Sequence, residues 1–376
     1  MHILLTGNTT FKLANFRAGL ISRLVEDGYR VTVMAPPDSY VATVRDNGCD
    51  FVPLRMSRNG VSPLNELRLL LSIFFQLRRI RPCFVFSYTI KNNIYAGLAC
   101  RMLRIPFAAN VTGLGPAFNR AGLFNTLIRF LYRLAFRRAA AVFFQNRDDQ
   151  KIFLEGNLVP AEAVRLLPGS GVDLKRFSVE PLPSSVEETR FLLIARMLWD
   201  KGVGIFSDAA HQVRRIHPKA RFQLLGPLDP DSKSGISRCE IERWVNEGRL
   251  DYLGATTDVR PAIRQAHCIV LPSYYREGTP RTLLEAAATG RPVITTDMPG
   301  CRDAVMPDIS GWLVPPRDAA SLANACLHFL NLTPDEQIRA GVAARRHIED
   351  HFDEQIVIEA YLGLLDRESQ EAASPR

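Results

Sequence analysis

The sequence lacks the features that mark membrane-spanning, secreted or disulfide-bonded proteins. Charged residues interrupt every apolar run before it reaches about 18 residues, so we expect no helix that spans a bilayer. The seven cysteines are scattered, with no CxxC pair and no Cys/His cluster, which argues against a zinc site or a disulfide framework. The start, MHILLTGN, has no basic segment and no cleavage site, so we expect no signal peptide and a cytoplasmic location.

Acidic residues are scarce in one part of the chain. Residues 51–140 contain 14 Lys and Arg but a single acid, Glu66. Residues 1–180 carry 24 basic and 12 acidic side chains, whereas residues 181–376 carry 23 and 27, so the net charge of +8 conceals a strongly basic first half. Such a surface suits an anionic partner.

The order of apolar runs predicts an α/β fold with two domains. The 376 residues, 47% hydrophobic and 23% charged, suffice for two separate cores. Strands alternating with helical patterns predict two mainly parallel, doubly wound sheets. The expected strands are HILLTG, RVTVMAP, DFVPL, CFVFSY, FAANVTG, AVFFQN and VRLLPG, then FLLIA, RFQLLG, DYLG, CIVLP, PVITT and GWLVP.

A Pro- and Ser-rich stretch, residues 181–189, is the expected linker between the two series. We therefore place the first domain at 1–180, the second at 190–350, and a final segment with a helix over about 354–367 at 351–376. After the first strand, NTTFKLAN is expected to be a loop and Phe16 to Asp27 a helix. No GxGxxG follows this strand, which gives little support for NAD, although Gly7 suits a close backbone approach. Paired domains of this kind also occur in periplasmic binding proteins, and the lack of a signal peptide counts against that class.

The stretch YREGTPRTLLEAAATG, residues 275–290, joins a loop to a helix between two expected strands. Thr279 suits the N-cap, Pro280 the first helical position and Gly290 the C-terminal cap. Glu277 falls in the loop and Glu285 inside the helix, eight positions apart. The plain alternative is one acid that complements the helix dipole and a second that is merely solvated.

A second stretch, ARMLWDKGV, follows the first strand of the second domain and carries Arg196 and Lys201. Two cations beside a helix N-terminus suit a diphosphate. The alternative is a pair of surface cations, with Lys201 paired to Asp200. No DxD-like pair lies in a suitable loop, so we expect neither a metal nor a cofactor.

Together, these two stretches resemble the E-x7-E and R-x4-K motifs of retaining GT-B glycosyltransferases of family 4. The resemblance implies the GT-B fold and a nucleotide-sugar donor, with UDP as the expected nucleotide. It also implies that the final helix packs back on the first domain. It assigns Glu277 to the transferred sugar, Glu285 to the ribose, and Arg196 and Lys201 to catalysis at the diphosphate. The further donor-binding candidates are Gly7, Gly254, Gly278, Thr279, Pro280, Arg281 and Thr282.

Three strings of the first domain, NFR, YTIKNNIY and VTGLGPAF, resemble the subset of this family that extends saccharides on polyprenyl diphosphate. The acceptor-side candidates are Asn15, Arg17, Lys91 and Thr112, of which Arg17 and Lys91 suit a lipid diphosphate. Each can equally be a surface charge or a core polar group. Some relatives have a donor-contacting histidine where NVTGLG has none, so that contact is not expected here.

Two basic amphipathic helices are expected over residues 64–81 and 123–138. Arg78, Arg79 and Arg81 end the first, and Arg129, Arg133 and Arg137 recur every four residues along the second. Such helices can lie on an anionic membrane, where each cation contributes about 1 kcal/mol. The alternatives are core-facing helices with a solvated basic stripe, and nucleic-acid binding, for which no motif is present.

The function expected from the sequence is transfer of a hexose or N-acetylhexosamine from a UDP-sugar to a polyprenyl-diphosphate-linked saccharide at the inner face of the membrane. One rival is a nucleotide-sugar epimerase on the same fold, which would act without an acceptor. Another is a nucleotide-sugar-binding subunit without turnover. The intact Glu277, Glu285, Arg196 and Lys201 speak against the second rival.

Overall fold

The computed structural model describes residues 1–56, 62–114, 122–184 and 188–373. The chain divides into two compact units, one formed by Met1–Ser170 with Glu354–Arg376 and the other by Gly171–Asp353. This division differs from the expected boundary at residue 180, because residues 171–180 pack with the second unit. Val172 and Phe177 belong to a core cluster of that unit, and the Glu180 N–H donates to the Thr289 carbonyl at 3.2 Å.

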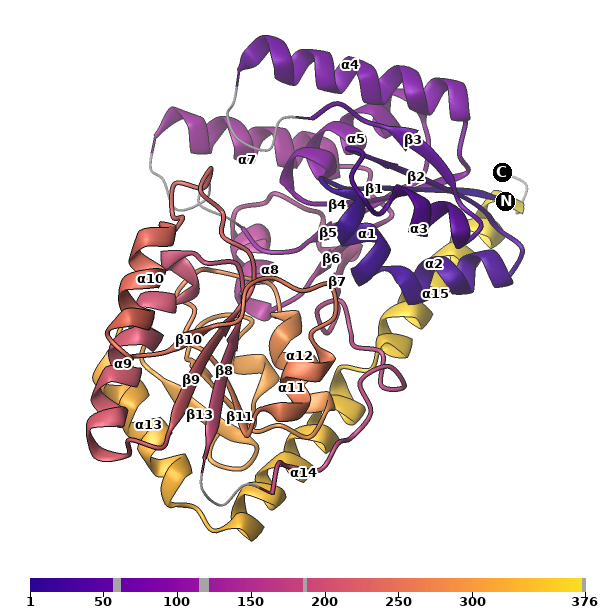
Figure 1. Ribbon diagram of the computed structural model, residues 1–376. Coiled ribbons are helices and arrows are strands. Elements are labelled where there is room, and N and C mark those ends of the chain that lie inside the picture. Colours follow the sequence, from indigo (N-terminus) through magenta and orange to yellow (C-terminus); the bar gives the residue numbers. More distant parts are fainter. Residues whose placement is uncertain (57–61, 115–121, 185–187, 374–376) are drawn as a thin grey trace. The chain divides into compact units, whose positions relative to one another are not determined.

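The first unit is built on a seven-stranded sheet in the order β3-β2-β1-β4-β5-β6-β7, and all of its strand pairs are parallel (Figure 1). The order reverses beside β1, where Leu4 pairs with Thr32 on one side and Val85 on the other. The sequence prediction of these seven strands is confirmed. Their bounds are β1 His2–Thr6, β2 Arg30–Ala35, β3 Asp50–Pro53, β4 Phe84–Tyr88, β5 Phe107–Val111, β6 Ala141–Phe144 and β7 Val164–Leu166.

Helices cover both faces of this sheet. One core cluster joins the sheet to α1 Thr10–Phe16, α2 Ala18–Glu26, α3 Val41–Asp46 and α15 Glu354–Ala373. The other joins it to α4 Pro63–Ile80, α5 Ile90–Leu103, α7 Leu123–Phe136 and α8 Arg147–Glu155, and the short η1 Ala161–Ala163 precedes β7. On this second face α5 packs against both α4 and α7, so the three helices lie side by side (Figure 1).

Most of the loop expected over residues 8–15 is helical, because α1 covers Thr10–Phe16, whereas the helix expected over 16–27 is present as α2, Ala18–Glu26. The Thr9 side chain accepts a hydrogen bond from the Lys12 N–H at 3.2 Å and caps α1, while Leu13 and Ala14 of α1 are buried. Arg17 ends α1 and begins α2. The prediction failed because the polar letters NTT were interpreted as a loop, although a threonine in that position is also an N-cap.

The last helix, α15, belongs to the first unit and is longer than the predicted 354–367. Tyr361 is 1% exposed and stacks on Phe143 with ring centroids 4.8 Å apart. The Asn110 side-chain amide donates to the Tyr361 hydroxyl at 2.9 Å, so the helix is held by a specific polar contact as well as by apolar packing.

The second unit carries a six-stranded, all-parallel sheet in the order β10-β9-β8-β11-β12-β13 (Figure 1). Its strands, all predicted from the sequence, are β8 Arg190–Ile194, β9 Arg221–Leu225, β10 Asp251–Tyr252, β11 Cys268–Leu271, β12 Val293–Thr296 and β13 Gly311–Val314. One face is covered by α9 Val203–Ile216, α10 Arg238–Asn246 and α13 Ala319–Asn331. The other is covered by α11 Arg260–Gln265, α12 Arg281–Ala288 and α14 Pro334–His351, and the 3₁₀ turns are η2 Trp199–Lys201 and η3 Arg302–Ala304.

Helix α12 begins one residue later than predicted. Pro280, and not Thr279, holds the N-cap position, and no side chain caps this end. The other end agrees with the prediction, since Thr289 is the C-cap and Gly290 follows it with φ +79°. The apolar stripe of Leu283, Leu284, Ala287 and Ala288 is buried, as expected.

Among the residues that the structure describes, no helix combines the length and the apolarity needed to cross a bilayer. Part of the predicted linker, residues 185–187, lies outside the described residues.

Candidate active site

The loops that follow β8 and β11 meet at one edge of the second sheet. The two strands are parallel neighbours, so their carboxyl ends lie together, and there the strand order reverses. Gly202 makes the meeting possible: its φ is +75°, and a Cβ at this position would lie 2.0 Å from the Pro272 carbonyl oxygen. The Tyr274 N–H also donates to the Asp200 carbonyl at 3.1 Å.

Lys201 and Glu277 form an ion pair across these two loops. Their side chains are only 17% and 14% exposed, so the pair is partly shielded from water. The Ser273 hydroxyl lies 2.8 Å from the other carboxylate oxygen of Glu277 and fixes its orientation. In this ion pair the partner of Lys201 is therefore Glu277, whereas the alternative considered from the sequence was Asp200.

Arg196 lies in the same loop, but it is held separately from this pair. Its Nη1 is 2.6 Å from Asp229 Oδ2, and more than half of its side chain is exposed. Its charge nevertheless acts on Tyr275: burial raises the pKa of this phenol, Glu277 and Asp200 raise it further, and Arg196 lowers it. The Lys201 ammonium is 6.0 Å from the centre of the Tyr275 ring. Arg196, Lys201 and Glu277 therefore all act on Tyr275.

Gly300 supports the loop that carries Glu277. Its φ is +81°, and a Cβ here would lie 2.1 Å from the Gly278 carbonyl oxygen and 2.8 Å from that of Glu277. The backbone after β12 therefore packs directly on residues 277–278. Sequence reasoning missed this glycine, and the signal that could have found it is the MPG string after the strand PVITT.

Glu285 has a separate environment. Its carboxylate accepts a hydrogen bond from Arg281 Nε at 3.1 Å, and both side chains are nearly buried. Burial raises the pKa of Glu285, and the charge and hydrogen bond of Arg281 oppose that shift. Asp258 also raises this pKa, so the loop that contains Gly254 and Asp258 contributes to the environment of Glu285. The structure thus gives each glutamate its own cation, Lys201 for Glu277 and Arg281 for Glu285.

The segment between the two glutamates is compact. Gly278, Thr279 and Pro280 are buried, and Thr282 is half-buried in the first turn of α12. The Pro280 carbonyl accepts from the Leu283 N–H at 3.1 Å. No acid occupies the first turn of α12, so the positive end of this helix is not neutralised from within.

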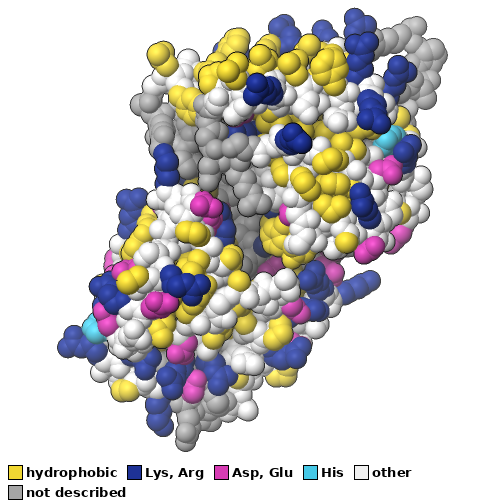
Figure 2. Space-filling view, turned by 45° about the horizontal axis from the view of Figure 1, so that its top comes forward, with side chains coloured by type: hydrophobic (Ala, Val, Ile, Leu, Met, Phe, Trp, Pro, Cys, Tyr) yellow, Lys and Arg dark blue, Asp and Glu magenta, His cyan; other side chains and the backbone are white. Residues whose placement is uncertain are grey.

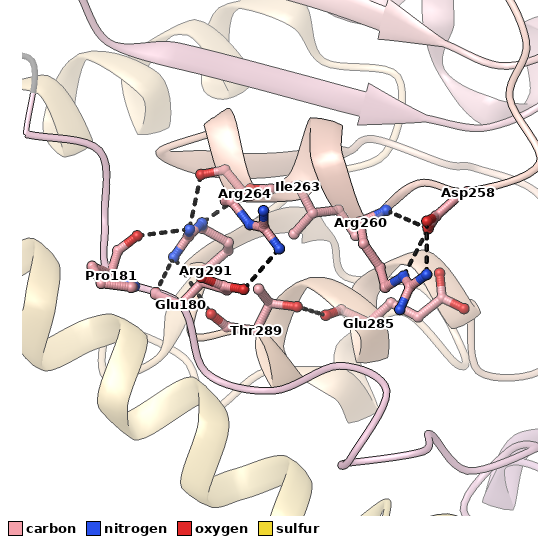
Figure 3. Close-up of polar contacts among 9 residues, drawn as sticks. All are labelled: Glu180, Pro181, Asp258, Arg260, Ile263, Arg264, Glu285, Thr289 and Arg291. Atoms are coloured by element: carbon pink, nitrogen blue, oxygen red, sulfur yellow. Dashed lines mark hydrogen bonds and ion pairs between the residues drawn. The ribbon is translucent and has the colours of Figure 1, made fainter.

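Arg291 holds the far end of α12 to the preceding chain (Figure 3). It is fully buried, and its guanidinium points at backbone carbonyls and not at an acid. It donates to four backbone carbonyl oxygens, those of Glu180 at 2.7 Å, Pro181 at 2.8 Å, Ile263 at 3.0 Å and Arg264 at 3.0 Å. Burial lowers the pKa of Arg291 to about 10, a value at which it stays charged near neutral pH. Sequence reasoning missed this residue.

The remaining candidates lie in the first unit. Gly7 follows β1, is buried, and its N–H donates to the Met34 carbonyl at 3.4 Å. Asn15 is engaged within α1, where its amide donates to the Phe11 carbonyl at 2.9 Å. Thr112 is half-buried just after β5, and residues 115–118 of the string VTGLGPAF lie outside the described residues.

Arg17 is the notable cation among them. It is 5% exposed, and its guanidinium lies 4.7 Å from the centre of the Tyr88 ring. Its side chain donates to the Phe16 carbonyl at 3.2 Å, and no carboxylate pairs with it within the part of the chain that the structure covers. Next to Tyr88, Thr89 has φ +76°, a conformation that a β-branched residue adopts only under constraint.

Lys91 does not present the open cation expected for a lipid diphosphate. Its Nζ lies 2.6 Å from Glu66 Oε1, and the Tyr95 hydroxyl donates to Glu66 Oε2 at 2.8 Å. The one acid of the basic segment 51–140 is thus fixed by a lysine and a tyrosine. No group of three or more His, Cys, Asp or Glu that could hold a metal is found among the described residues.

Two family models match the chain. "Glycosyl transferase 4-like domain" covers residues 14–169, and "Glycosyl transferases group 1" covers residues 188–331. Among curated proteins, the chain is 29% identical over 371 residues to the N,N'-diacetylbacillosaminyl-diphospho-undecaprenol alpha-1,3-N-acetylgalactosaminyltransferase of Campylobacter jejuni, covering 94% of this chain and 95% of that protein. It is 23% identical to the UDP-Gal:alpha-D-GlcNAc-diphosphoundecaprenol alpha-1,3-galactosyltransferase of Escherichia coli, covering 73% of each.

Solved structures show the same fold. Sucrose-phosphate synthase from Thermosynechococcus elongatus aligns with a TM-score of 0.78 at 21% identity, over 99% of this chain and 100% of that one. HepE from Anabaena, in complex with UDP-glucose, aligns with a TM-score of 0.77 at 18% identity over the whole of both chains. The chain therefore belongs to the glycosyltransferases that combine a glycosyl transferase 4-like domain with a glycosyl transferases group 1 domain. It is an enzyme with the GT-B fold.

Proposed function

We propose that this glycosyltransferase moves a hexose or N-acetylhexosamine, with retention of configuration, from a UDP-sugar to a polyprenyl-diphosphate-linked saccharide in the assembly of a bacterial surface glycan. The observation that carries the proposal is the shielded ion pair of Lys201 and Glu277, steadied by Ser273, at the carboxyl ends of β8 and β11. The likeness to the Campylobacter jejuni enzyme over nearly the whole of both chains supports the acceptor class.

Lys201 and Arg196 bind the diphosphate of the donor. An ammonium has three donors, so Lys201 keeps Glu277 in place and still donates to phosphate oxygens. Both cations stabilise the charge that develops on the diphosphate as the bond between the sugar and its oxygen breaks. Glu277 positions the sugar, and Glu285, held by Arg281, accepts hydrogen bonds from the ribose hydroxyls.

The reaction itself needs no protein nucleophile. The acceptor hydroxyl oxygen bonds to the anomeric carbon on the face that UDP leaves, and the departing phosphate oxygen takes the hydroxyl proton. One carbon–oxygen bond breaks as another forms, and UDP is the leaving group. Because Arg196 and Lys201 supply the positive charge at the phosphates, we propose that no metal or cofactor takes part; EDTA then leaves the transfer rate unchanged.

The first unit presents the acceptor from the membrane surface. The exposed side of α4 carries apolar residues, and so does that of α7: Leu64, Leu67, Leu71 and Phe75 on the first, and Leu123, Phe124, Leu127 and Phe130 on the second. Figure 2, in which the top of Figure 1 comes forward, shows hydrophobic side chains gathered along the upper edge of the view among Lys and Arg side chains. We propose a peripheral position on the anionic inner face of the membrane, since this combination suits an interfacial helix pair.

The arginines of α7 contribute to this surface unequally. Arg133 is exposed as well, but its Nε and Nη2 donate to the backbone carbonyls of Asn157 at 2.9 Å and Gly156 at 3.0 Å, so part of its guanidinium is engaged within the protein. Arg78 and Arg79 of α4 and Arg137 at the end of α7 are exposed. In this proposal the exposed apolar stripes and these arginines, and not Arg133, contact lipid.

A transfer assay tests the function. The full chain is incubated with a set of UDP-sugars and short polyprenyl diphosphate saccharides, and the products are read by mass spectrometry. We expect one donor to extend one acceptor by a single sugar, and Glu277→Gln to lower kcat by about 100-fold or more while the affinity for UDP stays nearly constant. The control is Glu242→Gln, which removes an exposed carboxylate of the same unit. Sugar transfer to none of the acceptors contradicts the proposal, and unchanged turnover in Glu277→Gln removes this residue from the site.

A further inference from the structure

A cavity opens at the carboxyl edge of the first sheet, beside the start of α4. Its volume is about 790 Å³, within the ~300–1,000 Å³ typical of small-molecule sites. The residues after β2 and β3 form one side, and the first half of α4 forms the other. Its lining includes Pro36, Met56, Asn65, Glu66, Arg68 and Ser72.

A fixed carboxylate is the main polar feature of this cavity. Glu66 accepts from Lys91 through one oxygen and from Tyr95 through the other, at 2.6 and 2.8 Å. Burial and the bond to Glu66 raise the pKa of Tyr95, so this phenol keeps its proton and remains a donor. Each carboxylate oxygen has a second lone pair available to a ligand hydroxyl. Glu66 therefore forms a preorganised hydrogen-bond acceptor, and its side chain remains 12% exposed.

The other lining groups complete a site of mixed character. Asn65 and Ser72 offer an amide and a hydroxyl, Arg68 offers donors, and Pro36 and Met56 provide apolar surface. A saccharide ring carries several hydroxyls on an apolar carbon frame, so it suits a site that offers both polar groups and apolar surface.

Helix α4 sets this cavity beside the surface proposed for lipid contact. At about 100° per residue, Asn65, Arg68 and Ser72 share one side of the helix, and the exposed Leu64, Leu71 and Phe75 share the neighbouring side. The buried Ile73 and Leu77 lie on the remaining side. Glu66 shares that side and is held there by Lys91 and Tyr95 of α5. These two adjacent sides of α4 therefore suit a molecule that has a lipid chain in the bilayer and a saccharide as its head group.

We propose that this cavity binds the saccharide of the lipid-linked acceptor, with the Glu66 carboxylate accepting hydrogen bonds from its sugar hydroxyls. Lys91 and Tyr95 are positioning residues that hold Glu66. This inference rests on the proposed function and specifies where the acceptor is recognised. It also gives Lys91 a role different from that of a diphosphate ligand.

Steady-state kinetics of the full chain test the cavity. We expect Glu66→Gln to raise the KM for the polyprenyl diphosphate saccharide by about 10-fold, because one oxygen acceptor becomes a donor. The KM for the UDP-sugar and the slow acceptor-independent hydrolysis of the donor stay unchanged. Tyr95→Phe raises the acceptor KM by a smaller factor at unchanged kcat, since Glu66 keeps its charge but loses one support.

A matched control is Asp50→Asn. Asp50 forms an exposed ion pair with Arg30 at 2.8 Å and begins β3, whereas the cavity lies where β3 ends. It should leave every kinetic constant unchanged. Ser72→Trp fills the cavity from α4 and should abolish use of the acceptor while UDP binding persists. An unchanged circular dichroism spectrum and urea unfolding curve show that the variant is folded. Free saccharide without lipid should inhibit the wild type and not Ser72→Trp.

The outcomes separate the two proposals. If the wild type uses no lipid-linked saccharide, the proposed function fails and this inference fails with it. If the wild type transfers sugar but Glu66→Gln and Ser72→Trp keep the acceptor KM within about twofold, the cavity is not the acceptor site. Inhibition by polyprenyl phosphate and not by free saccharide would likewise overturn it, since the lipid portion alone would then be recognised.

Discussion

Gly300 and Gly248 share a left-handed backbone but differ in their surroundings. Their φ angles are +81° and +67°. A Cβ at Gly300 would lie 2.1 Å from the Gly278 carbonyl oxygen, whereas one at Gly248 would meet nothing within 4 Å. The pair therefore separates the cost of the backbone conformation from the cost of the close approach beneath the Glu277 loop.

We predict that Gly300→Ala destabilises the protein by about 2 kcal/mol more than Gly248→Ala. Gly248→Ala should cost about 1 kcal/mol, because only the conformation is strained. Denaturant unfolding of both variants measures the difference. Gly300→Ala should also weaken turnover, since residues 277–278 must shift. Equal losses in the two variants would show that the contact between these loops is not tight.

His267 gives the stability of the second unit a pH dependence. Burial and nearby Arg190 and Arg291 lower the pKa of this histidine from 6.5 to about 4, and its Nδ1 accepts from the Arg190 N–H at 3.1 Å. The unfolded chain therefore binds the proton first. The stabilisation from a neutral His267 is present above pH 6.5 and is lost as pH falls from 6.5 towards 4.

We expect the free energy of unfolding of the wild type to fall by up to about 3 kcal/mol over this pH range through His267 alone. His267→Gln should flatten that part of the curve, and His211→Gln, an exposed control, should leave its slope unchanged. Chemical denaturation at a series of pH values gives the slopes. A His267→Gln curve parallel to that of the wild type would refute the assignment.

At the scale of elements, α4 and α7 leave apolar side chains in water. Leu71 and Phe75, four residues apart on α4, are 45% and 60% exposed. Ile338 and Val342 of α14 have the same spacing and are 50% and 63% exposed. The second pair is a matched control on the other unit, equally apolar and equally exposed.

We predict that Leu71→Ser with Phe75→Ser weakens binding to anionic phospholipid vesicles by about 10-fold, because two apolar side chains no longer enter the interface. Co-sedimentation measures the bound fraction. Ile338→Ser with Val342→Ser should bind like the wild type, and neutral vesicles should bind all three proteins weakly. If both double variants bind equally well, α4 is not the contact surface.

The sequence was informative about elements where periodicity and turn residues agreed. All thirteen strands found among the described residues were predicted, because each is a short apolar run between Gly, Pro or polar residues. Helix α1 was missed because Thr9 is as compatible with a loop as with an N-cap. The partners of the candidate residues were beyond reach: Asp229 for Arg196 and Glu66 for Lys91 come from distant positions that only the fold brings together.

At the scale of the whole molecule, the chain returns to the first unit through α15. Tyr361 packs against Phe86 and Phe143, with ring centroids 4.8 Å away in each case, and accepts a hydrogen bond from Asn110. The boundary near residue 170 could not be read from composition, because the Pro- and Ser-rich stretch that looks like a linker begins ten residues later, at Pro181. The return of the last helix to the first domain was expected from the family resemblance and not from composition.

We predict that Tyr361→Ala lowers the free energy of unfolding of the first unit by about 3–5 kcal/mol, because it empties a buried aromatic site. Tyr361→Phe should cost about 1–3 kcal/mol, since it only deprives the Asn110 amide of its acceptor. Urea unfolding followed by circular dichroism distinguishes the two. Equal and small effects would mean that α15 is held mainly at other points.

The buried Arg291 also decides how the C-terminal half can be studied by itself. A fragment that starts at residue 188, where the group 1 family model begins its match, would omit the Glu180 and Pro181 carbonyls that accept from this guanidinium. A charge that is fully desolvated in the intact protein would then lose two of its acceptors. An expression clone for this half should therefore begin at or before Gly171, where the second unit begins.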